Sequence, residues 1–201
     1  MLGPTEWAPV NFAVWSTLQY GARASLMSDY LAIGVMVCVG IAVVWDFRWG
    51  RIPNQLTYSA MLVGLLVRTL TAGWRGLLDG LAAGLVGGGV FFIFFLVRGM
   101  GAGDVKLMTA VGVWSGLHQL PAVLIVTALA GGVLAIGYMF ARKQARRTLR
   151  NVGSLFRFHA ILGLTPHPEI NLENPQAIRI PYALAIAAGV LYVSGMTLLR
   201  G

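Results

Sequence analysis

Two aspartates stand at the ends of apolar runs in a chain that has only seven carboxylates: Asp46 in VVWDFRWGRIPN and Asp104 in RGMGAGDVKL. A pair of carboxylates that shares one proton can perform aspartic proteolysis, because one ionised oxygen takes a proton from water while the other acid polarises the scissile carbonyl. Such a pair titrates as one coupled unit. The two residues therefore predict acid–base chemistry, provided that the fold brings them together.

Each aspartate also has a structural interpretation. Asp104 follows glycine-rich backbone and precedes an apolar run, which is typical of a helix N-cap whose carboxylate accepts backbone N–H groups and complements the helix dipole. Asp46 closes an apolar run at its C-terminal end, where a negative charge opposes the dipole, so a structural role explains it less well. Ionisable residues near membrane depth are candidates for function.

The residues around Asp104 suit the approach of a peptide. Gly99, Gly101 and Gly103 permit tight backbone turns and let an extended chain come close. Lys106 has two interpretations, which are tuning of the aspartate and binding of a lipid phosphate.

The composition predicts an integral membrane protein, since 57% of the 201 residues are hydrophobic and only 11% are charged. The apolar runs lack the alternation of barrel strands, so we expect helices, because only helices and closed barrels satisfy the backbone in lipid. The first and fourth runs are short for a full bilayer. The expected fold class is all-α, a polytopic membrane protein with about six transmembrane helices at residues 30–45, 55–73, 77–97, 105–117, 121–141 and 180–199.

The chain divides into a lead-in and one membrane-embedded domain. Residues 1–29 form an N-terminal interfacial or external lead-in without the features of a removable signal peptide. Residues 30–201 form the membrane-embedded domain, which includes a basic cytoplasmic segment at residues 142–179. Two crossings, through 55–73 and 77–97, separate the two aspartates, so both aspartates are expected on the same side of the membrane in either orientation.

Lysine and arginine residues set the expected orientation, because they concentrate on the cytoplasmic side. With the loop at 46–54 in the cytoplasm, four basic residues lie outside, at Arg23, Arg68, Arg75 and Arg200. The other eleven of the fifteen lie inside, at Arg48, Arg51, Arg98, Lys106, Arg142, Lys143, Arg146, Arg147, Arg150, Arg157 and Arg179. We attribute the net charge of +8 to topology and to contact with anionic lipid, and expect no nucleic-acid partner.

Three short segments resemble one family, in order along the chain. DFRWGRIPN is similar to the D-x-R-x-x-x-I-P-N segment of type IV prepilin peptidases, and GAGDVK to their G-x-G-D-x-K motif. RIPYALAIAAG, residues 179–189, resembles the Ile-Pro-aromatic opening of the family's final span. The resemblance implies an intramembrane aspartic endopeptidase of the cytoplasmic (inner) membrane that removes the short basic leader of a prepilin at the cytoplasmic face, cleaving after a glycine.

The same resemblance implies the roles of individual residues. Asp46 and Asp104 carry over as the catalytic pair. Substrate positioning or support of the motifs falls to Arg48, Ile52, Pro53, Asn54, Gly101, Gly103 and Lys106. The implied partners are a prepilin or pseudopilin precursor, membrane lipid, and the pilus assembly or secretion machinery; no cofactor and no metal are expected.

The single cysteine marks a departure from the larger members of the family. Those members carry a cytoplasmic segment with paired CxxC motifs, associated with zinc and with methylation of the new pilin N-terminus, whereas this chain has only Cys38. The chain therefore resembles the short, peptidase-only branch found in tight-adherence pilus systems. An archaeal-type preflagellin peptidase and a small proton- or cation-coupled transporter that uses the two aspartates remain alternatives.

Overall fold

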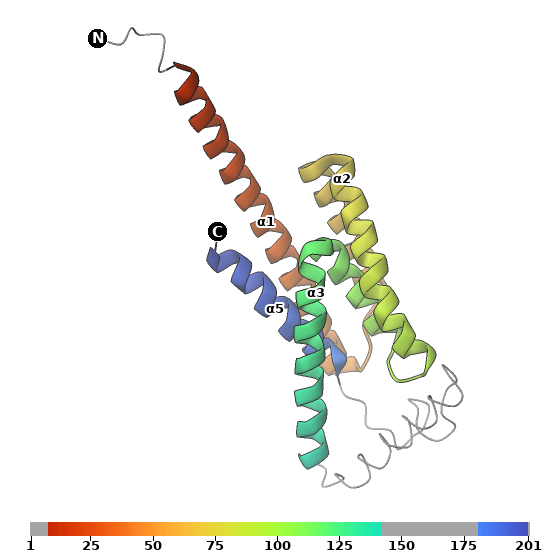
Figure 1. The fold of residues 1–201 in the computed structure, drawn as a ribbon. Helices are drawn as coiled ribbons and strands as arrows, with labels where there is room; N and C mark the ends of the chain where they lie inside the picture. The colour runs from red at the N-terminus through yellow and green to blue at the C-terminus, as the bar shows by residue number, and fades with distance from the viewer. Residues whose placement is uncertain (1–7, 142–180, 201) are drawn as a thin grey trace, which may run out of the picture.

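The computed structural model describes residues 8–141 and 181–200, and Figure 1 shows their arrangement. This part of the chain is helical apart from short connections, with the helices α1 (Ala8–Trp49), α2 (Asn54–Leu96), α3 (Ala102–Ala141) and α5 (Tyr182–Arg200). Each of the four contains a stretch long and apolar enough to cross a membrane. The expectation of an all-α polytopic membrane protein is confirmed.

The apolar side chains point outward as well as inward. Leu70, Leu85 and Leu129 are between 66% and 77% exposed, which would be costly in water but not in lipid. Because lipid offers no hydrogen bonds, the backbone has to satisfy itself within each helix. Lipid contact therefore explains why these segments are apolar on all sides and still form helices.

Four helices that are long and apolar enough to cross a membrane, rather than six separate ones, are found among the described residues. The predicted runs 55–73 and 77–97 are joined in α2, and the runs 105–117 and 121–141 are joined in α3. Each joint is a single non-helical glycine. The prediction of six separate helices is wrong at these joints, because one glycine with a positive φ redirects each helix while the residues between the predicted runs, 74–76 and 118–120, are helical.

The joint in α2 is a sharp reversal at Gly73, where φ is 61° and ψ is −150°. Figure 1 shows α2 folded back on itself. Arg68 and Asp79, eleven residues apart, form an ion pair across the turn, whereas eleven residues of straight helix would span about 16 Å. The arms 54–72 and 74–96 therefore lie against each other.

The joint in α3 lies at Gly116, where φ is 74° and ψ is 170°. It separates a short arm, residues 102–115, from a longer arm, residues 117–141. In Figure 1 the two arms meet in a bend at the end of the bundle away from the connecting loops. The short arm is the fourth predicted run, which was expected to be short for a bilayer.

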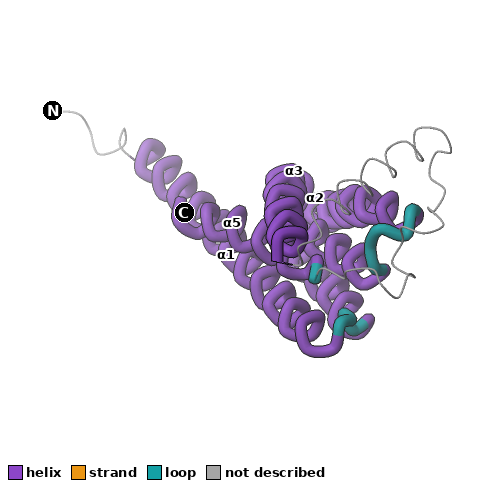
Figure 2. Tube along the Cα trace, turned by 90° about the horizontal axis from the view of Figure 1, so that it is seen from below, coloured by secondary structure: helices purple, strands orange, loops and turns teal. Residues whose placement is uncertain are grey.

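The two connecting loops, residues 50–53 and 97–101, lie at one end of the bundle. Figure 2 is viewed from that end and shows both loops in teal, with the start of α5 beside them. The end of α1, both ends of α2 and the starts of α3 and α5 therefore lie at the same end of the bundle.

The N-terminal boundary differs from the expected lead-in. Helix α1 begins at Ala8 and continues without a break to Trp49, so residues 8–29 belong to the same helix as the first span. The stretch that is apolar enough to cross a membrane begins at Asp29. The basic segment at 142–179 lies outside the described residues, and the proposed division at residue 30 stays a prediction.

The core forms where α3 contacts the other helices. Small residues allow close contact with α2: a Cβ on Gly112 would lie 2.5 Å from the carbonyl oxygen of Ala83. The largest fully buried side chains come from α1, α2, α3 and α5 and are Val35, Val39, Thr57, Leu107, Met108, Val111, Leu120, Val123, Thr127, Ile186 and Val190. Helix α3 is thus packed against other helices on several sides. Its N-terminal end lies at the end of the bundle that carries the two connecting loops.

Candidate active site

Asp46 lies in the last turn of α1, and its side chain is half-buried. The backbone N–H of Gly50 donates to the carbonyl oxygen of Asp46 at 2.8 Å and closes the helix. The backbone N–H of Ala183, in the first turn of α5, faces the carboxylate. The negative charge of Asp46 opposes the dipole of α1. The N-terminal end of α5, whose first N–H groups have no intrahelical partners, compensates this charge.

Asp104 lies in the first turn of α3. Its backbone N–H donates to the carbonyl oxygen of Gly101 at 3.1 Å, and its carboxylate folds back toward the backbone of the same glycine. A Cβ on Gly101 would lie 3.2 Å from Oδ2 of Asp104. Asp104 is therefore not the N-cap that the structural interpretation predicts: the helix begins at Ala102, and the carboxylate reaches back from the first turn to the backbone of Gly101.

The fold places the two aspartates near each other. Asp104 interacts electrostatically with Asp46, and it interacts in the same way with Tyr182 of α5. The end of α1 and the beginnings of α3 and α5 meet at this point. Capping contacts and an acid–base role are therefore compatible for Asp104, because the same carboxylate faces both its own helix and the neighbouring aspartate.

The segment after Asp46 packs against the start of α3. Ile52 is buried, and a Cβ on Gly103 would lie 3.3 Å from Cβ of Ile52. Nζ of Lys106 donates to Oδ1 of Asn54 at 2.8 Å and lies 5.3 Å from the centroid of the Tyr58 ring. Residues of the first motif thus contact residues of the second, directly beside the aspartates.

Two of the predicted supporting residues lie further from the pair. Arg48 is exposed, with its guanidinium 5.6 Å from the centroid of the Trp49 ring. Pro53 occupies the N-cap position of α2 with φ of −64° and ψ of 136°, and its carbonyl oxygen accepts from the N–H of Thr57 at 3.3 Å. Pro53 therefore has the structural role of a helix start, and the described contact of Arg48 is with Trp49.

Sequence analysis missed Tyr182 and Ala183 as site residues. It treated Ile180, Pro181 and Tyr182 as the opening of a span, and Ile180 lies outside the described residues. Tyr182 is half-buried, and a Cβ on Gly131 in the long arm of α3 would lie 3.5 Å from its Cε1. The Ile-Pro-aromatic segment was the available signal, but it does not reveal which helix ends α5 will meet.

Comparison with known proteins adds the family. Residues 33–136, about half of the chain and including both aspartates, match the sequence profile of the type IV leader peptidase family. The chain belongs to this family. Similar curated members are each named prepilin leader peptidase/N-methyltransferase. The one from Aeromonas salmonicida is 35% identical over 147 residues, which cover 70% of this chain and 48% of the relative.

Two further leader peptidase relatives give comparable matches. The protein of Xanthomonas campestris pv. campestris is 32% identical over 111 residues, covering 51% of this chain and 38% of its own length. The protein of Escherichia coli K12 is 32% identical over 117 residues, covering 54% of this chain and 50% of its own length. The chain thus spans about half or less of these relatives. No solved structure matches this leader peptidase family member significantly.

Proposed function

We propose that this protein is an intramembrane aspartic endopeptidase that removes the basic leader peptide of prepilin-like substrates. The observation that supports the proposal most strongly is the electrostatic interaction between Asp46 and Asp104, which belong to different helices and are separated in sequence by the whole of α2. Membership of the type IV leader peptidase family, and the names of the relatives, support the same reaction and substrate class.

The chemistry needs one ionised and one protonated carboxyl group. The ionised carboxylate takes a proton from water, and the resulting hydroxide attacks the carbonyl carbon of the scissile bond. The protonated carboxyl group donates a hydrogen bond to the carbonyl oxygen and stabilises the charge that develops there. Collapse of the tetrahedral intermediate then breaks the C–N bond, and the leaving amine takes a proton from the pair. Two adjacent carboxylates that share one proton supply both forms at once.

The motif residues position the substrate in this proposal. Gly101 and Gly103 support the motif by letting neighbouring groups pack closely around Asp104, since a Cβ would lie 3.2 Å from Oδ2 of Asp104 at Gly101 and 3.3 Å from Cβ of Ile52 at Gly103. The contact between Asn54 and Lys106 ties the start of α2 to the start of α3. Ile52 packs against Gly103 at the same junction. Arg48 and Pro53 support the segment that links α1 to α2.

We place the pair at the cytoplasmic face of the inner membrane, with six crossings made by α1, the two arms of α2, the two arms of α3, and α5. The aspartate end of α1 carries exposed aromatic side chains at Trp45, Phe47 and Trp49. Aromatic residues of this kind prefer the headgroup level of a bilayer, which supports a site at the membrane surface. A basic leader would reach such a site from the cytoplasm while the apolar helix of the substrate stays in lipid.

The proposed partners are a prepilin or pseudopilin precursor, membrane lipid, and the pilus assembly or secretion machinery. The relatives' name couples the peptidase to an N-methyltransferase. For this chain we propose the peptidase reaction, because the proposed chemistry uses only residues around the aspartate pair.

Reconstituted protein and a leader-bearing pilin precursor test the proposal. Asp46→Asn and Asp104→Asn should each lower the cleavage rate by about 100-fold to 10,000-fold, because each removes one partner of the acid–base pair. Asp29→Asn, at the other end of the first span, is the matched control and should cleave like the parent. Failure of the parent to cleave, or full cleavage by either folded site variant, would contradict the proposal. Ion-dependent uptake into proteoliposomes would favour a transporter instead.

A further inference from the structure

An ion pair lies where α2 and α3 bend, at the opposite end of the bundle from the two aspartates. Nη1 of Arg68 donates to Oδ2 of Asp79 at 2.5 Å, and the two side chains are 11% and 38% exposed. Neither residue belongs to a family motif described above. Arg68 is 11% exposed, and burying a charge is costly unless it is paired, so its presence at this bend calls for a specific task.

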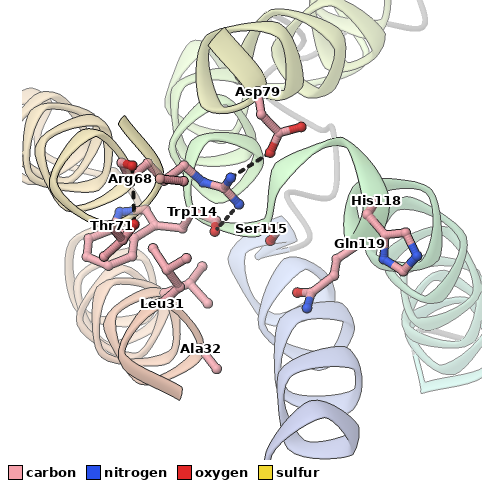
Figure 3. A pocket seen from close by; sticks show the side chains of 11 residues that line it. Leu31, Ala32, Arg68, Thr71, Asp79, Trp114, Ser115, His118 and Gln119 are labelled. Carbon is pink, nitrogen blue, oxygen red and sulfur yellow. Dashed lines mark hydrogen bonds and ion pairs between the residues drawn. The ribbon is translucent and has the colours of Figure 1, made fainter. Parts of the chain in front are cut away.

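The ion pair binds backbone groups that the break in α3 leaves without helical partners. Nη2 of Arg68 donates to the carbonyl oxygen of Trp114 at 3.0 Å, on the side of the short arm. The backbone N–H of Leu117 donates to Oδ1 of Asp79 at 3.3 Å, on the side of the long arm. The last carbonyl groups of one helix and the first N–H groups of the next have no intrahelical partner, and lipid offers none. Figure 3 shows the guanidinium between Asp79 and Trp114.

Gly116 lets the two charged groups come this close. A Cβ at this position would collide with Nη2 of Arg68 and with Oδ2 of Asp79. The indole Nε1 of Trp114 also donates to the carbonyl oxygen of Ala60 at 2.8 Å. The break in α3 is therefore fastened to both arms of α2, through Ala60 and Arg68 on the first arm and through Asp79 on the second.

Arg68 and Asp79 also line a pocket beside the break. The pocket, of about 370 Å³, lies between the break and α1, and Leu31, Val35, Ser115 and Gln119 are among the residues that line it. Nε of Arg68 is buried without a hydrogen-bond partner, which adds to the cost of the arrangement. Polar contacts therefore act together with the buried Trp114 side chain, which is 7% exposed, in defining the position of the break.

The position of the break determines where Asp104 lies. The short arm, residues 102–115, carries Asp104 in its first turn and Trp114 in its last, about 15 Å further along the axis. A rotation at Gly116 would therefore be transmitted along one helical rod to the carboxylate. We propose that Arg68 and Asp79 act as positioning residues, forming a charge clamp that fixes the direction of the arm 102–115 and thereby holds Asp104 against Asp46. The proposal deepens, and rests on, the proposed peptidase function.

Cleavage kinetics of the full chain provide the first test. Asp79→Asn and the double variant Arg68→Met/Asp79→Leu should lower kcat by about 10-fold to 100-fold, because misplacing a catalytic group by about 1 Å has an effect of this size. KM should stay within about twofold, since the clamp is remote from the substrate. The double variant avoids leaving one buried charge alone, which makes it the variant expected to fold if a single one does not. Arg75→Met, an exposed arginine of the same helix, is the matched control.

A distance measurement provides a readout that does not depend on activity. In a Cys38→Ala background, spin labels at Val44→Cys on α1 and Ala102→Cys on the short arm report the separation of the two helix ends that carry the aspartates. The distance distribution should broaden or shift in Asp79→Asn and in the double variant, and should match the parent in Arg75→Met. This measurement separates a loss of position from a loss of chemistry.

The outcomes are distinct. Parental kcat together with a parental distance distribution in both clamp variants would overturn the clamp and leave the proposed function intact. If the parent does not cleave, the proposed function fails, whereas the distance measurement still tests the clamp. If neither clamp variant is recovered from membranes while Arg75→Met is, the pair serves folding and the positioning role is wrong.

Discussion

Lys106 of α3 donates a hydrogen bond from Nζ to Oδ1 of Asn54 at the start of α2, at 2.8 Å. The contact joins one residue of the segment that follows Asp46 to one residue of the segment that contains Asp104. Both interpretations of Lys106 from sequence, tuning of the aspartate and lipid binding, omit this partner. The lysine therefore ties together two helix starts beside the aspartate pair.

Loss of this tie should weaken catalysis without unfolding the protein. We expect Lys106→Met to lower kcat/KM by about 10-fold, because a hydrogen bond to a charged group is worth about 1.5 kcal/mol at the lower end of its range. Asn54→Ala should have a similar effect, and the double variant should be no worse than either single one. Gln55→Ala, at the neighbouring exposed position, is the control. Additive effects of the two single changes would show that the contact contributes nothing to the site.

A methyl group at Gly101 should displace the Asp104 carboxylate. Its Cβ would lie 3.2 Å from Oδ2, so the carboxylate has to move by a few tenths of an ångström. We expect Gly101→Ala to lower kcat by about 10-fold, with unchanged amounts of protein in the membrane. Gly99→Ala meets only ordinary contacts at 3.5 Å and 3.8 Å and should act like the parent. Equal rates for the two alanine variants would contradict this account.

The contribution of the Tyr182 hydroxyl group to catalysis can be tested separately from the contribution of its ring to stability. Tyr182→Phe keeps the packing against α3 and removes only the hydroxyl group near Asp104, so it should lower kcat by less than about 10-fold while the stability stays parental. Tyr182→Ala also removes the half-buried ring and should lower the free energy of unfolding by about 2 kcal/mol. Tyr192→Phe, at an exposed position of the same helix, should change neither quantity. A larger loss of stability in Tyr182→Phe than in Tyr182→Ala would be incompatible with the described packing.

The two bend glycines should differ in their tolerance of alanine. Gly73 and Gly116 both have a positive φ, so either substitution adds backbone strain of about 1–3 kcal/mol. Nothing lies within 4 Å of a Cβ at Gly73, whereas a Cβ at Gly116 overlaps the Arg68–Asp79 pair. Unfolding in detergent should therefore show Gly116→Ala to be the less stable of the two. Gly132→Ala, in a helix with open space around the Cβ, should be at least as stable as the parent.

Much of the architecture could be predicted from local patterns. Apolar runs without alternation predicted membrane helices, and an even number of runs between Asp46 and Asp104 predicted a common end for the two residues. The prediction was wrong about the joints: it left gaps at 74–76 and 118–120, whereas one glycine with a positive φ makes each turn and the residues in these gaps are helical. The basic segment at 142–179 lies outside the described residues, so its predicted role stays a prediction.

The sequence by itself determined the number of apolar arms, the family motifs and the two candidate acids, because hydropathy and residue type are properties of short stretches of chain. Only the tertiary structure decided that the first turn of α5 meets both aspartates, and that Arg68 and Asp79 hold the break in α3. These contacts join residues whose spacing along the chain carries no periodic signal. They arise because each helix end and each break leaves backbone groups that must find partners, and which partner is near depends on how the helices pack.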